Sequence, residues 1–239
     1  MEAQMEGNIL DAIRKAFSDV EDLGPRHEKK PPESVFMNRS RQEIFSYLCQ
    51  RPCSALANIS RDLKMSSITV KWHLEKLVAG KFIVRASAGK KTVFYPFDFI
   101  EPAQTAILSC LNENLPKRVM SIILRSGGVS QKELCASLGI GHQTVVYNIS
   151  KLRKSGLVSA MRDGKYTRYY STGLLPRMRE SGMRRIGQFR KNFLKMLRMD
   201  GVSPRVAHST YGELHVEISR GSDKSILIFH TDPFATVLA

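Results

Sequence analysis

Hydrophobic positions recur at helical spacing in two stretches of the chain, and the stretches match each other at a constant offset of 75 residues. Residues 41–95 align with residues 116–170 without a gap, and apolar character persists where identity is lost. Each copy opens with apolar residues at the spacing of a helix, over 41–50 and 116–125. The pattern indicates two copies of one small module.

Two further helices are predicted in each copy. Ser130 and Glu133 have the spacing of a capping box, which marks the start of a helix. In this region the first copy has Ser54 with Ala57 three residues later, so its cap is weaker. After a short break, a third helix in each copy carries one apolar stripe, formed by Val70, Leu74 and Leu77 in the first and by Val145, Ile149 and Leu152 in the second.

Each copy ends in two β-prone runs around a glycine turn. The runs are 82–85 and 92–95 in the first copy and 157–160 and 167–170 in the second, where Asp163 and Gly164 give the strongest hairpin signal. Helix-turn-helix followed by a basic hairpin is a winged helix. The predicted fold class is therefore mainly α with small β-hairpin wings (α+β), with tandem winged helix-turn-helix domains, flanking helices and a C-terminal β-hairpin.

Two motifs carry a resemblance to a known family. They are Ser-Ile-Thr-Val-Lys-Trp-His-Leu-Glu-Lys-Leu at 67–77 and Gln-Thr-Val-Val-Tyr-Asn-Ile-Ser-Lys-Leu-Arg-Lys-Ser-Gly-Leu-Val at 143–158. On these motifs the sequence resembles winged-helix regulators of the ArsR and MarR type, especially archaeal regulators with two helix-turn-helix units. The resemblance covers about half of the chain and is specific for the fold rather than for the regulated genes.

The predicted organisation has five parts, at 1–38, 39–99, 100–115, 116–175 and 176–239. Residues 7–23 form an amphipathic helix that would contact a second chain, pack on the first module or remain without a partner, and the proline-rich residues 24–34 form a linker. A connecting helix from about 102 to 113 joins the modules. Because this join is short, the spacing of the modules is expected to contribute to recognition.

The last part contains a basic helix and a hairpin. The helix at 175–199 has Ile186, Phe189, Phe193 and Leu197 on one face, and it would either mediate a homodimer or fold back on the second module. The runs 213–219 and 225–230 alternate like the strands of a hairpin. His208, His215, His230 and Asp232 could be arranged around a metal, but their spacing does not demand it. We therefore expect no metal and no cofactor.

The basic charge of the chain is localised. The net charge is +15, with 11 Lys and Arg against 4 Asp and Glu over 39–99, 10 against 2 over 116–175, and 8 against 2 over 176–200. Residues 1–38 are acidic, with 5 against 8. A localised excess of this kind matches the electrostatic footprint of a protein that binds a phosphate backbone.

The third helix of each module is the candidate reading helix, because the N-terminal residues of such a helix enter the major groove. In the second module, the amides of Gln143 and Asn148 could pair with adenine edges. Trp72 has an alternative role, packing on the wing or the first helix, and His73 is expected to be half-buried and hydrogen-bonded within its module. The predicted contact residues are Ser67, Thr69, Lys71, Trp72, Lys90 and Lys91 in the first module and His142, Gln143, Thr144, Tyr147, Asn148, Lys151, Arg162, Lys165 and Arg168 in the second.

The turns of the two modules differ. Gly139, Gly141 and Gly156 of the second module are replaced in the first by Lys64, Ser66 and Lys81. The second module is therefore the firmer candidate for DNA reading, and the first could instead be a structural or partner-binding copy.

Other function classes have little support in the sequence. No apolar run approaches the roughly 20 residues of a membrane helix, and the N-terminus lacks the form of a signal peptide, so we expect a cytoplasmic protein. The cysteines show no metal or redox spacing, and Cys49 and Cys135 are expected to be buried thiols. No P-loop or hydrolase motif is present, so an enzyme is not expected.

The function predicted from the sequence is a sequence-specific double-stranded DNA-binding transcriptional regulator. The alternatives are a replication initiator or nucleoid-associated protein, and a winged-helix protein-interaction module of a transcription assembly. A homodimer through the N-terminal helix or through helix 175–199 is compatible with the first prediction.

Overall fold

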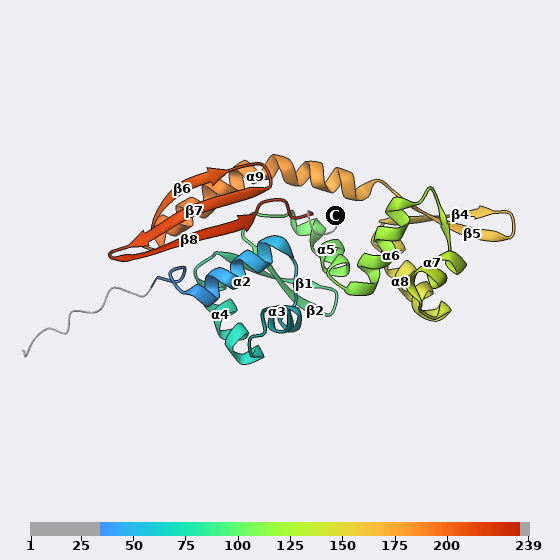
Figure 1. Cartoon of the computed structure of the whole chain (residues 1–239), viewed down its shortest axis with the longest axis horizontal. Coiled ribbons are helices and arrows are strands. Elements are labelled where there is room, and N and C mark those ends of the chain that lie inside the picture. The colour runs from blue at the N-terminus through green and yellow to red at the C-terminus, as the bar shows by residue number, and fades with distance from the viewer. Residues whose placement is uncertain (1–33, 235–239) are drawn as a thin grey trace, which may run out of the picture. The chain divides into compact units, whose positions relative to one another are not determined.

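The computed structural model describes residues 34–234 (Figure 1). The predicted helix at 7–23 and nearly all of the predicted linker at 24–34 lie outside this range. Within it, the structure combines α-helices with antiparallel sheets, in agreement with the mixed fold class predicted above. None of the helices in this part of the chain has the length and hydropathy needed to cross a membrane.

The first module has three helices followed by a hairpin. These elements are α2 (Arg39–Gln50), α3 (Leu56–Leu63), α4 (Ser67–Ala79), β1 (Ile83–Ala88) and β2 (Lys91–Pro96). The hydroxyl of Ser66 accepts a hydrogen bond from the backbone N–H of Thr69 at 3.1 Å and caps α4. Helix α3 begins after Ala55 and has no side-chain cap, which agrees with the weak capping pattern of this copy.

The connection between the modules is a broken helix rather than a continuous one. A 3₁₀ turn, η1 (Pro102–Gln104), leads into α5 (Thr105–Leu111), and α6 (Asn114–Arg125) follows after two residues. The helix predicted over about 102–113 is therefore present as η1 followed directly by α5, and it ends two residues earlier than predicted, at Leu111. Asn112 occupies the break, where its side-chain Nδ2 donates to the carbonyl oxygen of Pro52 at 2.6 Å.

The second module repeats the order of elements found in the first. Helix α6 is followed by β3 (Val129–Ser130), α7 (Gln131–Leu138), α8 (His142–Lys154), β4 (Val158–Asp163) and β5 (Tyr166–Ser171). Both bonds of the predicted capping box are present, because Ser130 and Glu133 each accept the other's backbone N–H. The short β3 adds a third strand beside β5, whereas the first module has only an isolated bridge between Ser54 and Phe94.

Two turns keep the same backbone in both modules although the residues differ. Gly139 and Gly156 have φ values of +65° and +72°, in the left-handed region that glycine adopts readily. Their counterparts Lys64 and Lys81 have φ values of +54° and +62°. The first module therefore holds two lysines in a conformation that disfavours a side chain.

The long helix α9 (Leu174–Met199) packs on the first module. The ring centroid of Phe193 lies 4.9 Å from that of Phe45 and 5.4 Å from that of Phe36, and the rings of Phe189 and Phe99 are 4.7 Å apart. The prediction that this helix folds back on the second module was wrong for the face that carries Phe189 and Phe193, because the first module buries that face. A homodimer through other faces of this helix stays a prediction.

A three-stranded antiparallel sheet follows α9 and lies beside it in Figure 1. The strands β7 (Glu213–Arg220) and β8 (Asp223–His230) form the predicted hairpin, and β6 (Ser203–Ser209) pairs with β7 on the other edge. Strand β6 was not predicted, since its side chains are mostly exposed and show no regular alternation of apolar and polar residues. The buried face of the sheet carries Leu214, Val216, Ile218, Leu227 and Phe229.

The chain from Ser34 onward belongs to the core of the first module. The carboxylate of Asp200 accepts the backbone N–H groups of Val35 and Phe36, both at 2.9 Å, and the hydroxyl of Ser34 at 2.5 Å. Phe36 is fully buried among aromatic rings. Residues 34–38, which precede the predicted start of the module at residue 39, thus pack with its core.

All four cysteines of the chain lie in the described range and are free thiols. Cys49, Cys53 and Cys110 are buried, while Cys135 is only partly buried. Burial raises the pKa of the Cys49 thiol well above its ordinary value, which keeps the group protonated and unreactive. The prediction of a buried thiol was right for Cys49 and only partly right for Cys135.

Candidate nucleic-acid interface

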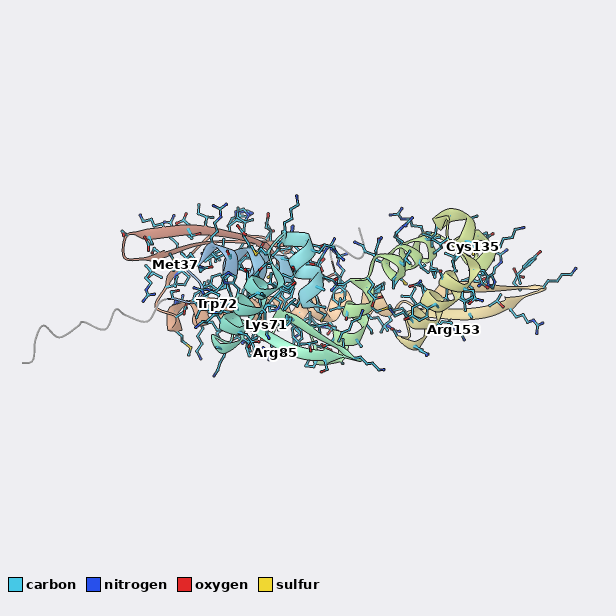
Figure 2. All side chains as sticks on the ribbon, turned by 90° about the horizontal axis from the view of Figure 1, so that it is seen from below. Met37, Lys71, Trp72, Arg85, Cys135 and Arg153 are labelled. Carbon is cyan, nitrogen blue, oxygen red and sulfur yellow. The ribbon has the colours of Figure 1, made fainter. Side chains whose placement is uncertain are left out.

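The third helix of the first module presents a polar face to solvent. Val70, Leu74 and Leu77 are buried as predicted, while Lys71 and Trp72, labelled in Figure 2, are exposed. Ser67 and Thr69 are also exposed at the start of α4, but their hydroxyls have partners within the chain. The Oγ1 of Thr69 lies 2.7 Å from the Oγ of Ser66, and the Oγ of Ser67 lies 3.4 Å from the Oγ of Ser60.

The indole of Trp72 is half-exposed and has two cations within 6 Å of its ring centroid. The guanidinium carbon of Arg41 is 5.7 Å from the ring centroid and the Nζ of Lys76 is 5.6 Å from it. Contact with Arg41 of α2 partly agrees with the alternative that Trp72 packs on the first helix. The ring nevertheless remains 51% exposed and carries positive charge beside it, so it can still contact a phosphate or a base.

Beneath Trp72, the imidazole of His73 is buried, with 6% of its surface exposed. Within residues 34–234 its Nδ1 has no hydrogen-bond partner, contrary to the predicted half-buried and bonded side chain. Burial and the nearby charge of Arg41 lower the pKa of His73 from its ordinary value of 6.5. The residue is therefore neutral at pH 7 and does not face a ligand.

The third helix of the second module exposes a longer run of candidate contacts. His142, Gln143 and Thr144 lie in its first turn and are exposed, and Tyr147 follows with 62% of its surface exposed. The Nζ of Lys151 lies 5.3 Å from the centroid of the Tyr147 ring. These side chains point into solvent along the N-terminal half of α8, where a reading helix contacts bases.

Asn148 is a correction to the predicted contact set. The side chain is only 3% exposed, and its Nδ2 donates to the backbone carbonyl of Thr144 at 2.7 Å. It lies three residues after Val145 and four before Leu152, on the edge of the buried stripe. This spacing could have excluded Asn148 from the exposed face, so we remove it from the candidate interface.

The wing of the second module combines free and paired cations. Arg162 and Lys165 are exposed around the hairpin turn. Arg168 is instead held by carboxylates, with its Nε 2.7 Å from Asp163 and its Nη1 3.7 Å from Glu133. Its charge is thus partly neutralised within the module, which weakens the prediction that Arg168 contacts DNA.

Glu113 joins two of the predicted contact lysines. Its carboxylate accepts from the Nζ of Lys91 on β2 at 2.8 Å and from the Nζ of Lys151 on α8 at 2.6 Å. Burial opposes ionisation of this carboxyl, but the hydrogen bonds and charges of the two lysines outweigh it and lower the pKa of Glu113. In the first wing Lys90 remains exposed, whereas Lys91 shares its charge with Glu113.

Sequence reasoning did not predict this role for Glu113. The available signal was the position of an acidic residue in the connection between two basic segments. The residue has polar neighbours in the sequence, so no periodic pattern identified its partners.

No candidate metal site is formed in the part of the chain that the structure describes. The rings of His208 and His215 lie 5.1 Å apart across β6 and β7, and the Nε2 of His215 is 3.3 Å from Glu213. Asp232 is bound instead by Arg179 at 2.8 Å. Hence Asp232, which could have joined the histidines around a metal, is used in an ion pair.

Comparison with known proteins finds sequence similarity over the second module. Residues 115–165, from α6 to the tip of the second wing, match the sequence profile of the MarR family. Over 138 residues, or 58% of this chain, the sequence is 29% identical to a Methanocaldococcus jannaschii protein described as an uncharacterized HTH-type transcriptional regulator. The chain spans 34% of the length of that curated relative.

Solved structures show weaker similarity. An ArsR-like transcriptional regulator from Rhodococcus sp. matches with a TM-score of 0.37 at 16% identity, over 41% of this chain and 92% of that chain. A protein from Corynebacterium diphtheriae matches with a TM-score of 0.24 at 22% identity, over 56% of this chain and 26% of that chain.

Proposed function

We propose that this chain is a sequence-specific, double-stranded DNA-binding transcriptional regulator of the winged-helix type that acts in the cytoplasm and is not an enzyme. The observation that carries the proposal is the exposed N-terminal half of α8 within a segment that matches the MarR family. A helix of this kind fits the major groove, where each base pair presents a distinct pattern of donors and acceptors.

In this proposal the second module reads bases and anchors to the backbone. Gln143 can pair bidentately with an adenine, and His142, Thr144 and Tyr147 contact neighbouring bases or phosphates. The exposed cations Arg162 and Lys165 of the wing bind the phosphate backbone or enter the minor groove.

The first module contributes a second, less polar reading surface. Lys71 and Trp72 are exposed on α4, and Lys90 is exposed at the tip of the wing. With both modules engaged, the spacing of two contact regions adds to recognition beyond what one helix can supply.

The proposal is tested by selecting bound fragments from the source genome and measuring their affinity by fluorescence anisotropy over a range of salt. We expect one preferred sequence and an affinity that falls steeply with salt. The variant R162Q/K165Q should bind more weakly to all sequences, and it should flatten the log–log salt slope by about 0.9 for each lost phosphate contact.

The matched control is R184Q/K191Q, which removes two exposed cations from α9. This control variant should bind DNA with the same affinity and the same salt slope as the unmodified chain, apart from the effect of its lower net charge. If no fragment is preferred over bulk DNA, sequence-specific regulation is rejected and a nucleoid-associated role becomes the better proposal.

One observation favours a second candidate function for the first module. Ile68, in the first turn of α4, is 84% exposed and lies one turn from the half-exposed Trp72. An exposed aliphatic beside an aromatic is typical of a protein-binding surface. The variant I68S should abolish a protein contact of this module while leaving DNA binding by the second module intact.

A further inference from the structure

A cavity of about 850 Å³ opens where the first module, the connection and α6 meet. Its walls come from α3, β2, α6 and the residue that follows α2, so it is built by segments far apart in the sequence. Six cationic side chains line it and Glu113 is the only carboxylate among the lining residues. The six cations are Arg51, Arg61, Lys91, Lys117, Arg118 and Arg125.

Half of these cations are not neutralised. Asp62 binds Arg51 at 2.8 Å and Arg61 at 2.9 Å, and Glu113 binds Lys91. By contrast, none of the three cations of α6 takes part in an ion pair within residues 34–234. These three are Lys117, Arg118 and Arg125.

The cations also repel one another. Burial and the charge of Arg51 both lower the pKa of Lys117, so this ammonium group lies in a partly desolvated and positively charged place. Bringing like charges together in a concave site costs free energy, and a bound anion would offset this repulsion.

Helix α6 aims a polar face into the cavity. Asn114, Arg118, Ser121 and Arg125 follow one another at intervals of four, three and four residues and therefore share one side of the helix. Its opposite side, with Val119, Met120 and Ile123, is buried in the second module. Helix α6 begins at Asn114, which lines the cavity, so the positive end of the helix dipole adds partial positive charge there.

The chemistry of the lining selects the kind of anion. Leu111 is the only apolar side chain among the lining residues, and no aromatic ring faces the cavity. A nucleobase would find no surface on which to stack, whereas several phosphates would each find a guanidinium or an ammonium group. The site therefore suits a row of phosphates rather than a complete nucleotide.

We propose that this cavity, named here the junction pocket, binds a chain of phosphates. Two sources share this chemistry, namely a free linear polyphosphate and the backbone of a DNA duplex that crosses between the modules. Only the second source rests on the proposed function. In both cases the phosphates compete with Glu113 for Lys91 at the rim of the pocket.

Calorimetric titration of the full chain with tripolyphosphate in the absence of DNA tests the site. We expect saturable binding of one molecule per chain and a loss of about tenfold in affinity for each guanidinium removed in R118Q/R125Q, as for a lost charged hydrogen bond. Both arginines are exposed and unpaired, so the fold should persist, which the thermal transition by circular dichroism checks.

The control variant R184Q/K191Q changes the net charge by the same amount outside the pocket. It should retain the affinity of the unmodified chain for tripolyphosphate. Absence of saturable binding, or an equal loss in both double variants, would show that the chain has only a diffuse basic surface and would overturn the proposal.

An anisotropy titration with the preferred DNA at constant ionic strength distinguishes the two sources. If the DNA backbone occupies the pocket, R118Q/R125Q weakens DNA binding and tripolyphosphate competes with DNA on the unmodified chain. If a free polyphosphate is the ligand, the variant binds DNA as the unmodified chain does. Since the calorimetric result is obtained without DNA, the junction pocket and the proposed regulatory function can fail separately.

Discussion

At the scale of single residues, the two modules bury a polar side chain at the same place. His73 and Asn148 are separated by the repeat offset of 75 and both face inward from the third helix. Asn148 satisfies its amide nitrogen on the carbonyl of Thr144, whereas the Nδ1 of His73 has no partner within the described residues. The position is thus structural in both copies. A role within the module was predicted for His73, whereas Asn148 was predicted to contact DNA.

The difference between Gln143 and Asn148 gives a prediction about specificity. The unmodified chain should prefer the selected DNA site over a site in which the adenine read by Gln143 is replaced by another base. Gln143→Ala should reduce this preference by about 1–3 kcal/mol, because it removes an exposed amide from the reading face. Its thermal midpoint should stay unchanged. Competition binding and thermal melting are the two measurements.

Asn148→Ala should have the opposite effect. It removes a buried hydrogen bond and should lower the free energy of unfolding by about 1 kcal/mol while leaving the ratio of site affinities unchanged. A loss of specificity with full stability in this variant would return Asn148 to the interface.

The buried imidazole of His73 makes stability depend on pH. Its pKa is lowered in the folded chain, so below about pH 6.5 the unfolded chain binds more protons than the folded one. This contribution to stability is complete above the ordinary pKa and is lost as the pH falls from that value through the lowered pKa of the folded chain. His73→Phe should therefore flatten the decline of the unfolding free energy between pH 7 and pH 5, measured by urea denaturation. Parallel pH profiles for both proteins would contradict the assignment.

At the scale of secondary-structure elements, the turns of the first module carry a local strain that the second module avoids. A left-handed backbone conformation costs a residue with a Cβ atom about 1–2 kcal/mol, so glycine at such a position stabilises the folded chain. Part of this stabilisation is lost because glycine also makes the unfolded chain more flexible. Lys64 and Lys81 adopt it where the second module has glycine.

We therefore expect Lys64→Gly and Lys81→Gly each to raise the free energy of unfolding by up to about 1 kcal/mol. Lys71→Gly is the matched control, since the same change inside α4 should lower stability by about 1 kcal/mol. Chemical denaturation monitored by tryptophan fluorescence measures these effects in the first module, because Trp72 is the single tryptophan of the chain.

The elements themselves were largely predictable from the sequence. Helical spacing located α2, α4, α6 and α8, and the glycine turns located the hairpins. The sequence could not supply the partner of an apolar face. The stripe of α9 was recognised, yet its packing on Phe36 and Phe45 depends on segments more than 140 residues away.

The interface was predictable to a similar degree. Exposure of Gln143 and Trp72 follows from the period of the buried stripe, and this part of the prediction agrees with the structure. The ion pairs of Lys91, Lys151 and Arg168 with carboxylates do not follow from local pattern, since they join different elements.

At the scale of the whole molecule, the core of the first module is completed by the C-terminal part of the chain. Phe193 of α9 contacts Phe36, Phe45 and Phe229 within one aromatic cluster. The apolar residues of α6, α7 and α8 instead lie close together in the sequence and form the core of the second module.

Phe193→Ala should accordingly lower the free energy of unfolding by about 3–5 kcal/mol through the cavity it leaves. The transition followed by the fluorescence of Trp72 should shift to lower denaturant concentration. The matched variant Ile149→Ala changes the core of the second module. It should shift the unfolding transition measured by far-UV circular dichroism more than the transition measured by the fluorescence of Trp72. Equal shifts of both signals in both variants would show that the two cores unfold as one unit.

The packing of α9 on the first module has a consequence for folding during synthesis. The chain leaves the ribosome N-terminus first, so the first module is made before α9. Its aromatic cluster cannot form until Phe193 and the strands that follow α9 have been synthesised. The segment made second needs no such delay. The second module is therefore expected to fold before the first, in the reverse of the order of synthesis. Until α9 and the strands after it have been made, the growing chain would expose Phe36, Phe45 and Phe82 to chaperones.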